Sequence, residues 1–148
     1  MTIRRAQPSD YGRVIQHVNA WWSGHERAPA LPKLFFVHFE GTTFVAERED
    51  GSLAGFICGF LSQTTDDEAY VHFVGVAPAE RGAGVGRVLF ERFFEEAGRH
   101  GRTIVRSVTS PDDEDSIAFH RALGFEAERV AEDYDGPGED RILLCKRL

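Results

Sequence analysis

The chain has 148 residues, about the length of one ordinary domain, and its 42% hydrophobic and 28% charged residues are typical of folded, soluble proteins. Its 17 lysines and arginines against 24 aspartates and glutamates give a formal net charge of −7. Such a field repels phosphate backbones and attracts cations, which argues against a general nucleic-acid binder.

The cysteines and the apolar runs of the sequence indicate in which cellular compartment the protein is expected. Cys58 and Cys145 are too few for a disulfide framework and lack the paired spacing of a zinc site. The basic start of the chain has no apolar segment behind it, and the longest apolar runs are soon broken by polar residues. We therefore expect a reduced, cytoplasmic protein that neither spans nor binds a membrane.

The first half of the chain predicts a short strand, two helical segments and three consecutive strands. Residues 2–5 are strand-like, and Pro8 followed by Asp10 suits the first turn of a helix, where a missing amide costs nothing and negative charge is favoured. An apolar group around Phe36 predicts a second short helix or turn. Three strands separated by polar turns then predict an antiparallel meander, at residues 43–47, 53–61 and 69–76.

The second half begins with the most regular predicted helix. Residues 84–100 have apolar side chains at helical spacing and charged side chains on the other faces. A strand, a helix ended by a glycine and two short final strands follow, at residues 103–109, 115–123, around Val130 and at 142–145. This order predicts a mixed α/β (α+β) fold in a single domain over residues 1–148.

Three glycines at alternate positions join the meander to the long helix. They are Gly82, Gly84 and Gly86. Glycine lets the backbone approach a ligand closely, and the unpaired amides at a helix start suit phosphate, so a pyrophosphate is the expected ligand. A Walker loop would end in Gly-Lys-Ser/Thr and the dinucleotide fingerprint would need a glycine at Arg87, so neither template fits. A tight turn without a ligand is the alternative.

This turn resembles the central motif of the GCN5-related N-acetyltransferases (GNAT family). In that family a strand ending in Val-x-Pro precedes Arg/Gln-x-x-Gly-x-Gly/Ala and a long helix, as residues 76–78 and 81–86 do here. Residues 113–125, which end in Leu-Gly-Phe, resemble a later motif of the family. The resemblance implies a mostly antiparallel twisted sheet flanked by helices, with splayed fourth and fifth strands, and acetyl transfer from acetyl-CoA to an amine.

The resemblance further implies that main-chain groups hold acetyl-CoA, without a metal. Strand residues would bind the pantetheine arm and the glycine turn the pyrophosphate: Val74, Gly75 and Val76 for the first, and Arg81, Gly82, Ala83, Gly84, Val85 and Gly86 for the second. Asp113 stands where the family has an asparagine near the cofactor. An ionised carboxylate cannot donate a hydrogen bond there and would face a phosphorylated ligand with like charge.

Two histidines are the candidate catalytic residues. His120 stands where the family has a tyrosine that protonates the departing CoA thiolate, and a histidinium would deliver the same proton. His72 lies four residues before Val76, where many family members carry a glutamate that acts as a base. The resemblance thus implies His120 as the acid and His72 as the base. A hydrogen-bonded packing role is the alternative for each.

The acceptor site is expected to be aromatic. Trp21, Trp22 and His25 fall where the family builds the acceptor wall from its first two helices, and Tyr134 on a late loop would reach the same opening. Aromatic faces suit a cation or a planar ligand, and the negative charge favours a small cationic amine.

Three further expectations depend on the same resemblance. One alternative acceptor is a protein N-terminus or lysine. From a different class, the chain would be an acyl-CoA sensor without catalysis, which Asp113 and the missing tyrosine favour. Since family members often pair through late strands, a homodimer is expected.

Overall fold

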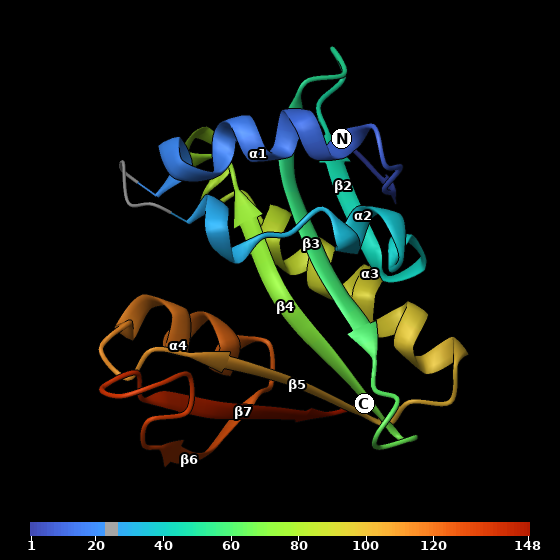
Figure 1. Ribbon diagram of the computed structural model, residues 1–148. Helices are drawn as coiled ribbons and strands as arrows, with labels where there is room; N and C mark the ends of the chain where they lie inside the picture. The colour runs from blue at the N-terminus through green and yellow to red at the C-terminus, as the bar shows by residue number, and fades with distance from the viewer. Residues whose placement is uncertain (23–26) are drawn as a thin grey trace. The chain divides into compact units, whose positions relative to one another are not determined.

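Figure 1 shows the computed structural model, which describes residues 1–22 and 27–148. Among these residues, seven strands form a sheet in the order β1-β2-β3-β4-β5-β7-β6. The strands are β1 (Thr2–Arg5), β2 (Thr43–Glu47), β3 (Leu53–Leu61), β4 (Glu68–Val76), β5 (Ile104–Thr109), β6 (Glu126–Ala131) and β7 (Arg141–Arg147). The α-helices are α1 (Asp10–Trp21), α2 (Leu34–Val37), α3 (Val85–Arg99) and α4 (Glu114–Ala122).

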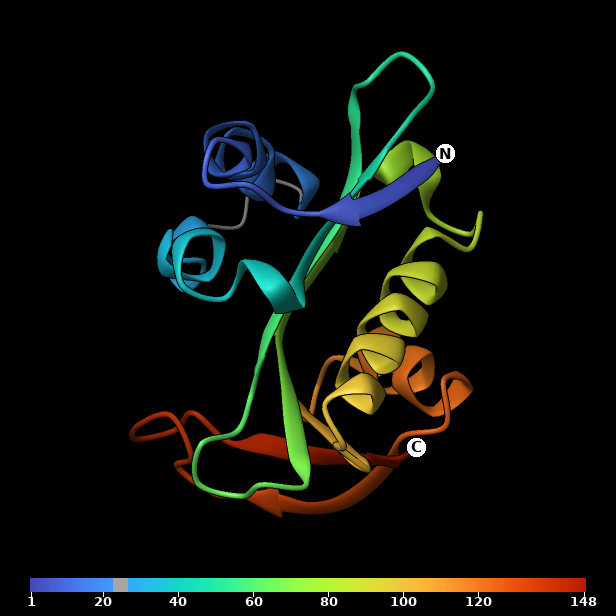
Figure 2. The same ribbon diagram turned by 90° about the vertical axis from the view of Figure 1, so that its right-hand side faces the viewer.

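Helices cover both faces of the strands that begin the sheet. Figure 2 shows α1 and α2 on one face of β2 and β3, and α3 on the other. Burial on both sides explains why β3 is almost uniformly apolar. The layers also pack closely: a Cβ at Gly55 on β3 would lie 2.8 Å from the carbonyl oxygen of Gly75 and 3.2 Å from Leu89 of α3. Only glycine fits at this crossing of strand and helix.

An ion-pair network ties β1 to the start of α1. Asp10, only 4% exposed, accepts Nη2 of Arg4 at 2.9 Å and the amide of Gln7 at 2.7 Å. Burial acts to raise the pKa of Asp10, but the hydrogen bonds from Arg4 and Gln7 outweigh it and the pKa is lowered. The ionised carboxylate therefore holds the entry to α1 in place.

The later strands form the other part of the sheet. β7 pairs antiparallel with both β5 and β6, and the parallel register of β4 with β5 comprises three pairs, from Glu68↔Ile104 to Tyr70↔Arg106. β4 itself continues to Val76 and β5 to Thr109. Pairing over only the first residues of β4 is what the expected splay of the fourth and fifth strands requires.

The predicted order of elements is confirmed, and the differences lie at element ends. The last two strands, expected around Val130 and at 142–145, are longer, and the last helix begins one residue earlier than predicted. The register of β6 shifts between Ala127 and Arg129, and five of its six residues are exposed. A shifted, solvated strand shows no alternation of apolar and polar residues, so its extent was not visible in the sequence.

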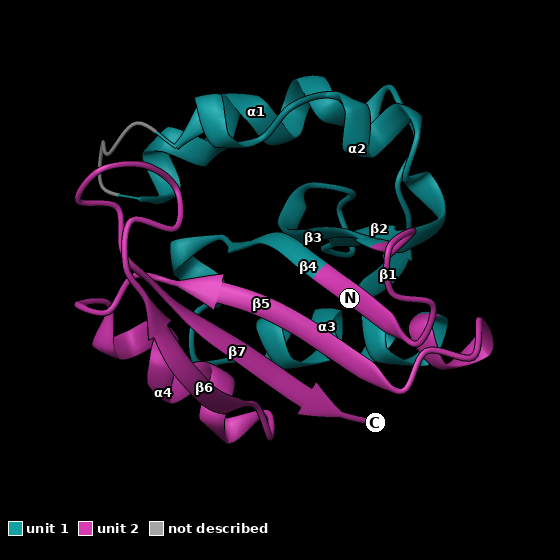
Figure 3. Ribbon diagram, turned by 60° about the horizontal axis from the view of Figure 1, so that its bottom comes forward, with its two compact units in different colours: residues 1–60, 71–96 teal, residues 61–70, 97–148 magenta. Residues whose placement is uncertain are grey.

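Contacts divide the chain into two compact units, coloured in Figure 3. Unit 1 comprises residues 1–60 and 71–96, and unit 2 comprises residues 61–70 and 97–148. Each unit therefore combines segments that are distant in the sequence. The prediction of one N-acetyltransferase domain stays a prediction.

Both cysteines are free and buried. Cys58 is 0% exposed in unit 1 and Cys145 is 9% exposed in unit 2. Burial raises the pKa of each thiol, most strongly that of Cys58. Within residues 1–22 and 27–148, no helix has the length and apolar character needed to cross a membrane.

Candidate active site

The glycine turn of unit 1 presents main-chain amides at the start of α3. Gly82 and Gly84 have φ angles of +83° and +88°, and a Cβ at either position would meet nothing within 4 Å. These glycines are therefore required by backbone conformation and not by crowding. The amide of Ala83 donates to Glu80 at 3.1 Å, whereas among the described residues the amides of Gly82 and Gly84 have no acceptor.

The geometry of this turn fits an anion. The first amides of α3, which begins at Val85, have no intrahelical acceptor, and the helix dipole places partial positive charge at the same end. Together with the two glycine amides they form a set of donors suited to a pyrophosphate. This fit depends on the main chain, and the predicted binding of a pyrophosphate stays a prediction.

The side chain of Arg81 contacts elements outside the glycine turn. Its Nε donates to the carbonyl oxygen of Val76 at 3.3 Å, and its Nη2 donates to the carbonyl oxygen of Trp21. The guanidinium thus contacts the ends of β4 and α1. Sequence reasoning missed this contact because no local pattern connects Arg81 to Trp21.

The predicted pantetheine-binding residues form the last part of β4. Gly75 is buried, while Val74 and Val76 are half-buried. A Cβ at Gly75 would lie 2.5 Å from Cε1 of Phe56 and 3.0 Å from Cη2 of Trp22. The indole of Trp22 is therefore packed directly against the backbone of β4.

His72, the predicted base, lies on β4 beside an aromatic cluster. It is exposed, its Nε2 lies 2.7 Å from the carbonyl oxygen of Ala30, and its ring stacks on Phe35 with centroids 4.7 Å apart and an angle of 11°. A carbonyl oxygen can only accept, so Nε2 carries the hydrogen and Nδ1 of the neutral ring holds the lone pair. Nδ1 is thus the atom that can accept a proton.

The tandem tryptophans have different environments. Trp21 is 7% exposed and lies in the core, stacked with His17 at 5.6 Å and with Phe56 at 6.2 Å. Trp22 is half-buried and meets Phe73 edge-on at 5.2 Å. Only Trp22 is therefore placed to offer part of its surface to an acceptor. His25, the third predicted wall residue, lies outside the described residues.

His120, the predicted acid, is buried on α4 in unit 2. It is 6% exposed, and its Nδ1 lies 2.7 Å from the carbonyl oxygen of Ser116, one turn earlier. Burial lowers the pKa of His120, and the hydrogen bond to Ser116 opposes this only in part. In the neutral ring Nδ1 carries the hydrogen and Nε2 the lone pair, the reverse of His72.

Asp113 caps α4. Its carboxylate accepts the amide of Ser116 at 3.1 Å, which is the ordinary role of aspartate at a helix N-cap. The hydroxyl of Thr109 on β5 also donates to Oγ of Ser116, at 2.9 Å. In unit 2 the side chain of Asp113 thus organises the helix that carries His120. Its predicted contact with the cofactor stays a prediction.

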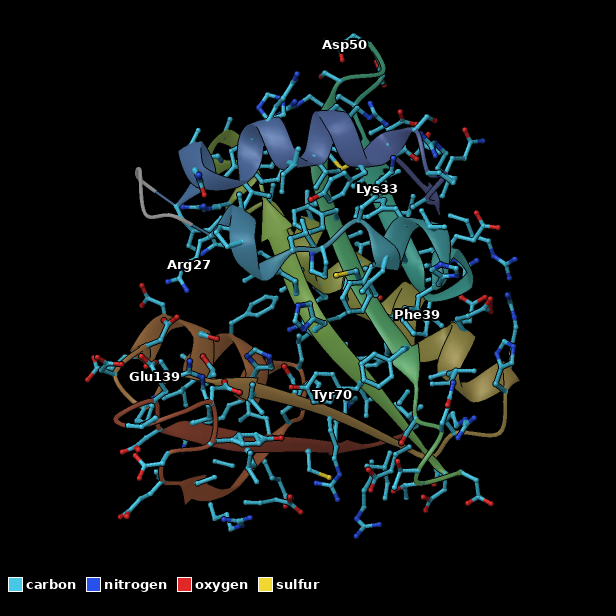
Figure 4. The ribbon with its side chains drawn as sticks, viewed as in Figure 1. Arg27, Lys33, Phe39, Asp50, Tyr70 and Glu139 are labelled. Carbon is cyan, nitrogen blue, oxygen red and sulfur yellow. The ribbon has the colours of Figure 1, made fainter. Side chains whose placement is uncertain are left out.

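Tyr134 belongs to a polar group that sequence reasoning only partly found. It is 47% exposed on the loop between β6 and β7, the loop on which Figure 4 labels Glu139. Nearby, Arg141 pairs with Asp135 at 2.8 Å and with Glu139 at 3.2 Å. Burial, then the neighbouring Tyr134 and Asp135, raise the pKa of Tyr70 on β4 to about 12. Tyr70 and Arg141 join this group through long-range contacts that leave no local signal.

Among the described residues, no three or more histidine, cysteine, aspartate or glutamate side chains are grouped so that they could hold a metal ion.

Comparison with known proteins assigns the chain to a family of α/β proteins. The model of the Acetyltransferase (GNAT) family matches residues 10–125 of the chain. The chain therefore belongs to the GNAT acetyltransferase family, and the resemblance drawn from the glycine motif is confirmed.

Individual relatives show how widely acceptors vary in the family. The L-2,4-diaminobutyric acid acetyltransferase of Nocardia farcinica is 40% identical over 85 residues, which cover 57% of this chain and 44% of that protein. The 5-NmdU N-acetyltransferase of Pseudomonas phage PaMx11 is 33% identical over 128 residues, which cover 84% of this chain and 86% of that protein. The chain thus spans less than half the length of the Nocardia protein and most of the phage protein.

A solved structure confirms the fold. The crystal structure of Chaetomium thermophilum Naa20 in complex with a bisubstrate analogue superposes with a TM-score of 0.81 at 24% identity, over 100% of this chain and 87% of that chain. The predicted GNAT fold, a mostly antiparallel sheet with a parallel β4–β5 pair and flanking helices, is therefore confirmed.

Proposed function

We propose that this protein transfers the acetyl group of acetyl-CoA directly to the primary amine of a small cationic acceptor. The observation that carries the proposal lies within unit 1. There β4 bears an exposed histidine with a lone pair on Nδ1 and leads into a turn whose Gly82 and Gly84 amides are unpaired among the described residues. Acetyl transfer needs a base for the amine and a site that binds the phosphates of acetyl-CoA. Here the candidate base lies on β4 and the anion-binding turn follows that strand.

Main-chain groups would hold the cosubstrate. The turn from Arg81 to Gly86 would bind the pyrophosphate through the amides of Gly82 and Gly84 and the first amides of α3, aided by the dipole of α3. The backbone of Val74, Gly75 and Val76 would bind the pantetheine arm. Acetyl-CoA supplies a thioester whose carbonyl carbon is the electrophile. A main-chain amide of β4 would stabilise the negative charge that develops on the carbonyl oxygen.

His72 would supply the neutral amine. An acceptor amine is an ammonium at neutral pH, and it becomes a nucleophile only after losing a proton. Nδ1 of His72 takes that proton, while the Nε2 hydrogen stays bonded to Ala30 and Phe35 fixes the plane of the ring. The new N–C bond then forms, the nitrogen releases its second proton to solvent, and the C–S bond breaks, which leaves a CoA thiolate.

His120 would return a proton to this thiolate. Because Nδ1 is bonded to the carbonyl of Ser116, the proton must be delivered from Nε2. Burial lowers the pKa of His120, so a rise in pH removes the proton that Nε2 would donate. The role therefore predicts a rate that falls as pH rises from the slightly acidic range.

Three features support a small cationic acceptor. The half-buried rings of Trp22 and Phe73 meet at 5.2 Å, the centroid of Phe73 lies 6.3 Å from that of the predicted base, His72, and ring faces bind cations. The net charge of −7 attracts them. A relative is named for acetylation of a diamino acid. A cytoplasmic location and a homodimer belong to the same proposal, and size-exclusion chromatography with light scattering tests the dimer.

The first experiment is titration calorimetry with acetyl-CoA, CoA and ATP, followed by mass spectrometry of acetylated products. The amine panel contains L-2,4-diaminobutyrate, polyamines, aminoglycosides and peptides. We expect binding of acetyl-CoA and CoA in preference to ATP, and a product with a small amine. Acetylation of peptides alone would show that the acceptor is a peptide or protein amine. Binding of acetyl-CoA without any product would favour an acyl-CoA sensor without catalysis. No binding of CoA would overturn the proposal.

A further inference from the structure

Arg81 connects two elements through main-chain oxygens. Its guanidinium donates to the carbonyl of Val76, at the end of β4, and to that of Trp21, at the end of α1. All three residues belong to unit 1. The main-chain amide of Arg81 donates to the carbonyl oxygen of Pro78 at 3.3 Å, and the proposed function gives the guanidinium no task.

The end of α1 is a place where a cation is needed. The last carbonyls of a helix have no intrahelical donor, and they carry the negative end of the helix dipole. α1 has no basic residue in its last turn that would meet this charge. Arg81, sixty residues further along the chain, supplies the cation and the donor from outside the helix.

The position of Trp22 depends on the end of α1. Trp22 is the residue that follows α1, and its indole packs on the β4 backbone at Gly75 and edge-on against Phe73. A shift of the helix end by a fraction of an ångström would move this ring relative to β4. The contact between Arg81 and Trp21 therefore fixes the position of Trp22, a residue of the predicted acceptor wall, against β4.

We propose that Arg81 is a positioning residue, whose guanidinium clamps the end of α1 to the end of β4 and so couples the cosubstrate turn to the acceptor wall. This inference rests on the proposed function for its kinetic consequence, but its structural part does not. The clamp assigns the side chain of Arg81 to acceptor binding and leaves cosubstrate binding to the amides of Gly82 and Gly84 and of the start of α3.

Fluorescence tests the clamp without any turnover. The two tryptophans of the chain are Trp21 and Trp22, so intrinsic emission reports on the end of α1 alone. We expect Arg81→Gln to shift the emission to longer wavelength and to increase acrylamide quenching roughly twofold, because loss of a charged donor leaves the carbonyl of Trp21 unpaired. Arg129→Gln, which removes the same charge from exposed β6, is the matched control and should behave as the wild type.

Kinetics then separates the clamp from a phosphate contact. For Arg81→Gln we expect KM for L-2,4-diaminobutyrate, or for the best amine of the panel, to rise roughly tenfold, since one charged hydrogen bond is lost. The Kd of acetyl-CoA by calorimetry should change less than about threefold. Arg81→Lys should restore part of the loss, since lysine keeps the charge but not the two-pronged geometry.

Each outcome decides the proposal. A tenfold weaker Kd for acetyl-CoA with unchanged tryptophan emission would show that the guanidinium binds phosphate, and would overturn the clamp. Unchanged emission and unchanged kinetics would overturn it as well. If the wild type turns over no amine, the proposed function fails, and the fluorescence of Arg81→Gln still decides whether the side chain holds the end of α1.

Discussion

The two histidines with proposed catalytic roles are held through opposite ring nitrogens. His72 uses Nε2 toward the carbonyl of Ala30, and His120 uses Nδ1 toward that of Ser116. The proposed roles therefore assign proton transfer to Nδ1 in the first and to Nε2 in the second. This difference selects the substitution that best isolates each role.

His72→Gln isolates the base. The glutamine amide can donate to Ala30 as Nε2 does, but it cannot accept a proton. We expect kcat to fall by about 10²-fold or more, with loss of one limb of the pH–rate profile and little change in the melting temperature. His38→Gln, at an exposed position just after α2, is the control. A kcat within twofold of the wild type would remove His72 from the mechanism.

His120 makes stability depend on pH. Burial lowers its pKa in the folded protein, so the unfolded chain binds a proton at a pH at which the folded chain does not. The contribution of neutral His120 to the free energy of unfolding is therefore fully present above the ordinary pKa range of histidine. It is lost as the pH falls through that range toward the pKa of His120 in the folded protein. In urea denaturation from about pH 7 to 5, His120→Asn should therefore show a shallower loss of unfolding free energy than the wild type. Identical slopes would contradict the effect of burial.

At the scale of elements, the turn before α3 requires positive φ angles but leaves room for a side chain. Gly82 and Gly84 have positive φ angles, whereas Gly98 lies inside α3 without one, and none of the three would meet a neighbour through a Cβ. We therefore expect alanine to destabilise the protein at Gly82 and Gly84 but to stabilise it at Gly98, although a Cβ has room at all three positions.

Alanine at these glycines is the corresponding test. Gly82→Ala and Gly84→Ala should each lower the free energy of unfolding by about 1–2 kcal/mol and weaken acetyl-CoA binding. Gly98→Ala should raise the free energy of unfolding by up to about 1 kcal/mol and leave binding unchanged. Urea denaturation and calorimetry measure both. Acetyl-CoA binding that survives in both turn variants would contradict the assignment of the turn.

Prediction from sequence succeeded where a local pattern defines the structure. The helical spacing in α3, the apolar run of β3 and the glycine turn each reflect their own residues. Contacts between distant segments have no such pattern. The split between a buried Trp21 and a half-buried Trp22, the carbonyl partners of the histidines and the orientation of Arg81 all depend on which elements pack together. These had to come from the structure.

At the scale of the whole molecule, the two units interleave along the chain. Unit 2 takes residues 61–70 from the middle of the sequence, and these supply the parallel partner of β5. Within unit 2, the amide of Thr103 donates to Asp67 at 2.9 Å and Arg106 pairs with Glu68 at 2.9 Å. The C-terminal segment alone is therefore an incomplete unit.

A fragment of residues 97–148 tests this dependence. Without the residues of β4 it leaves one side of β5 unpaired, and we expect no cooperative thermal transition by circular dichroism. The full chain carrying Glu68→Gln serves as the comparison, and it should melt cooperatively with a loss of at most about 1 kcal/mol. A sharp transition in the fragment would show that the segment folds without its partner strand.

The burial of both cysteines has a practical consequence. Cys58 and Cys145 are 0% and 9% exposed, and burial raises the pKa of both thiols. A colorimetric disulfide reagent reacts with thiolates, so the folded protein should contribute little to the signal. Free coenzyme A released by turnover would then be read continuously against a low background, and a slow extra rise of two equivalents per chain would mark denaturation in the same cuvette.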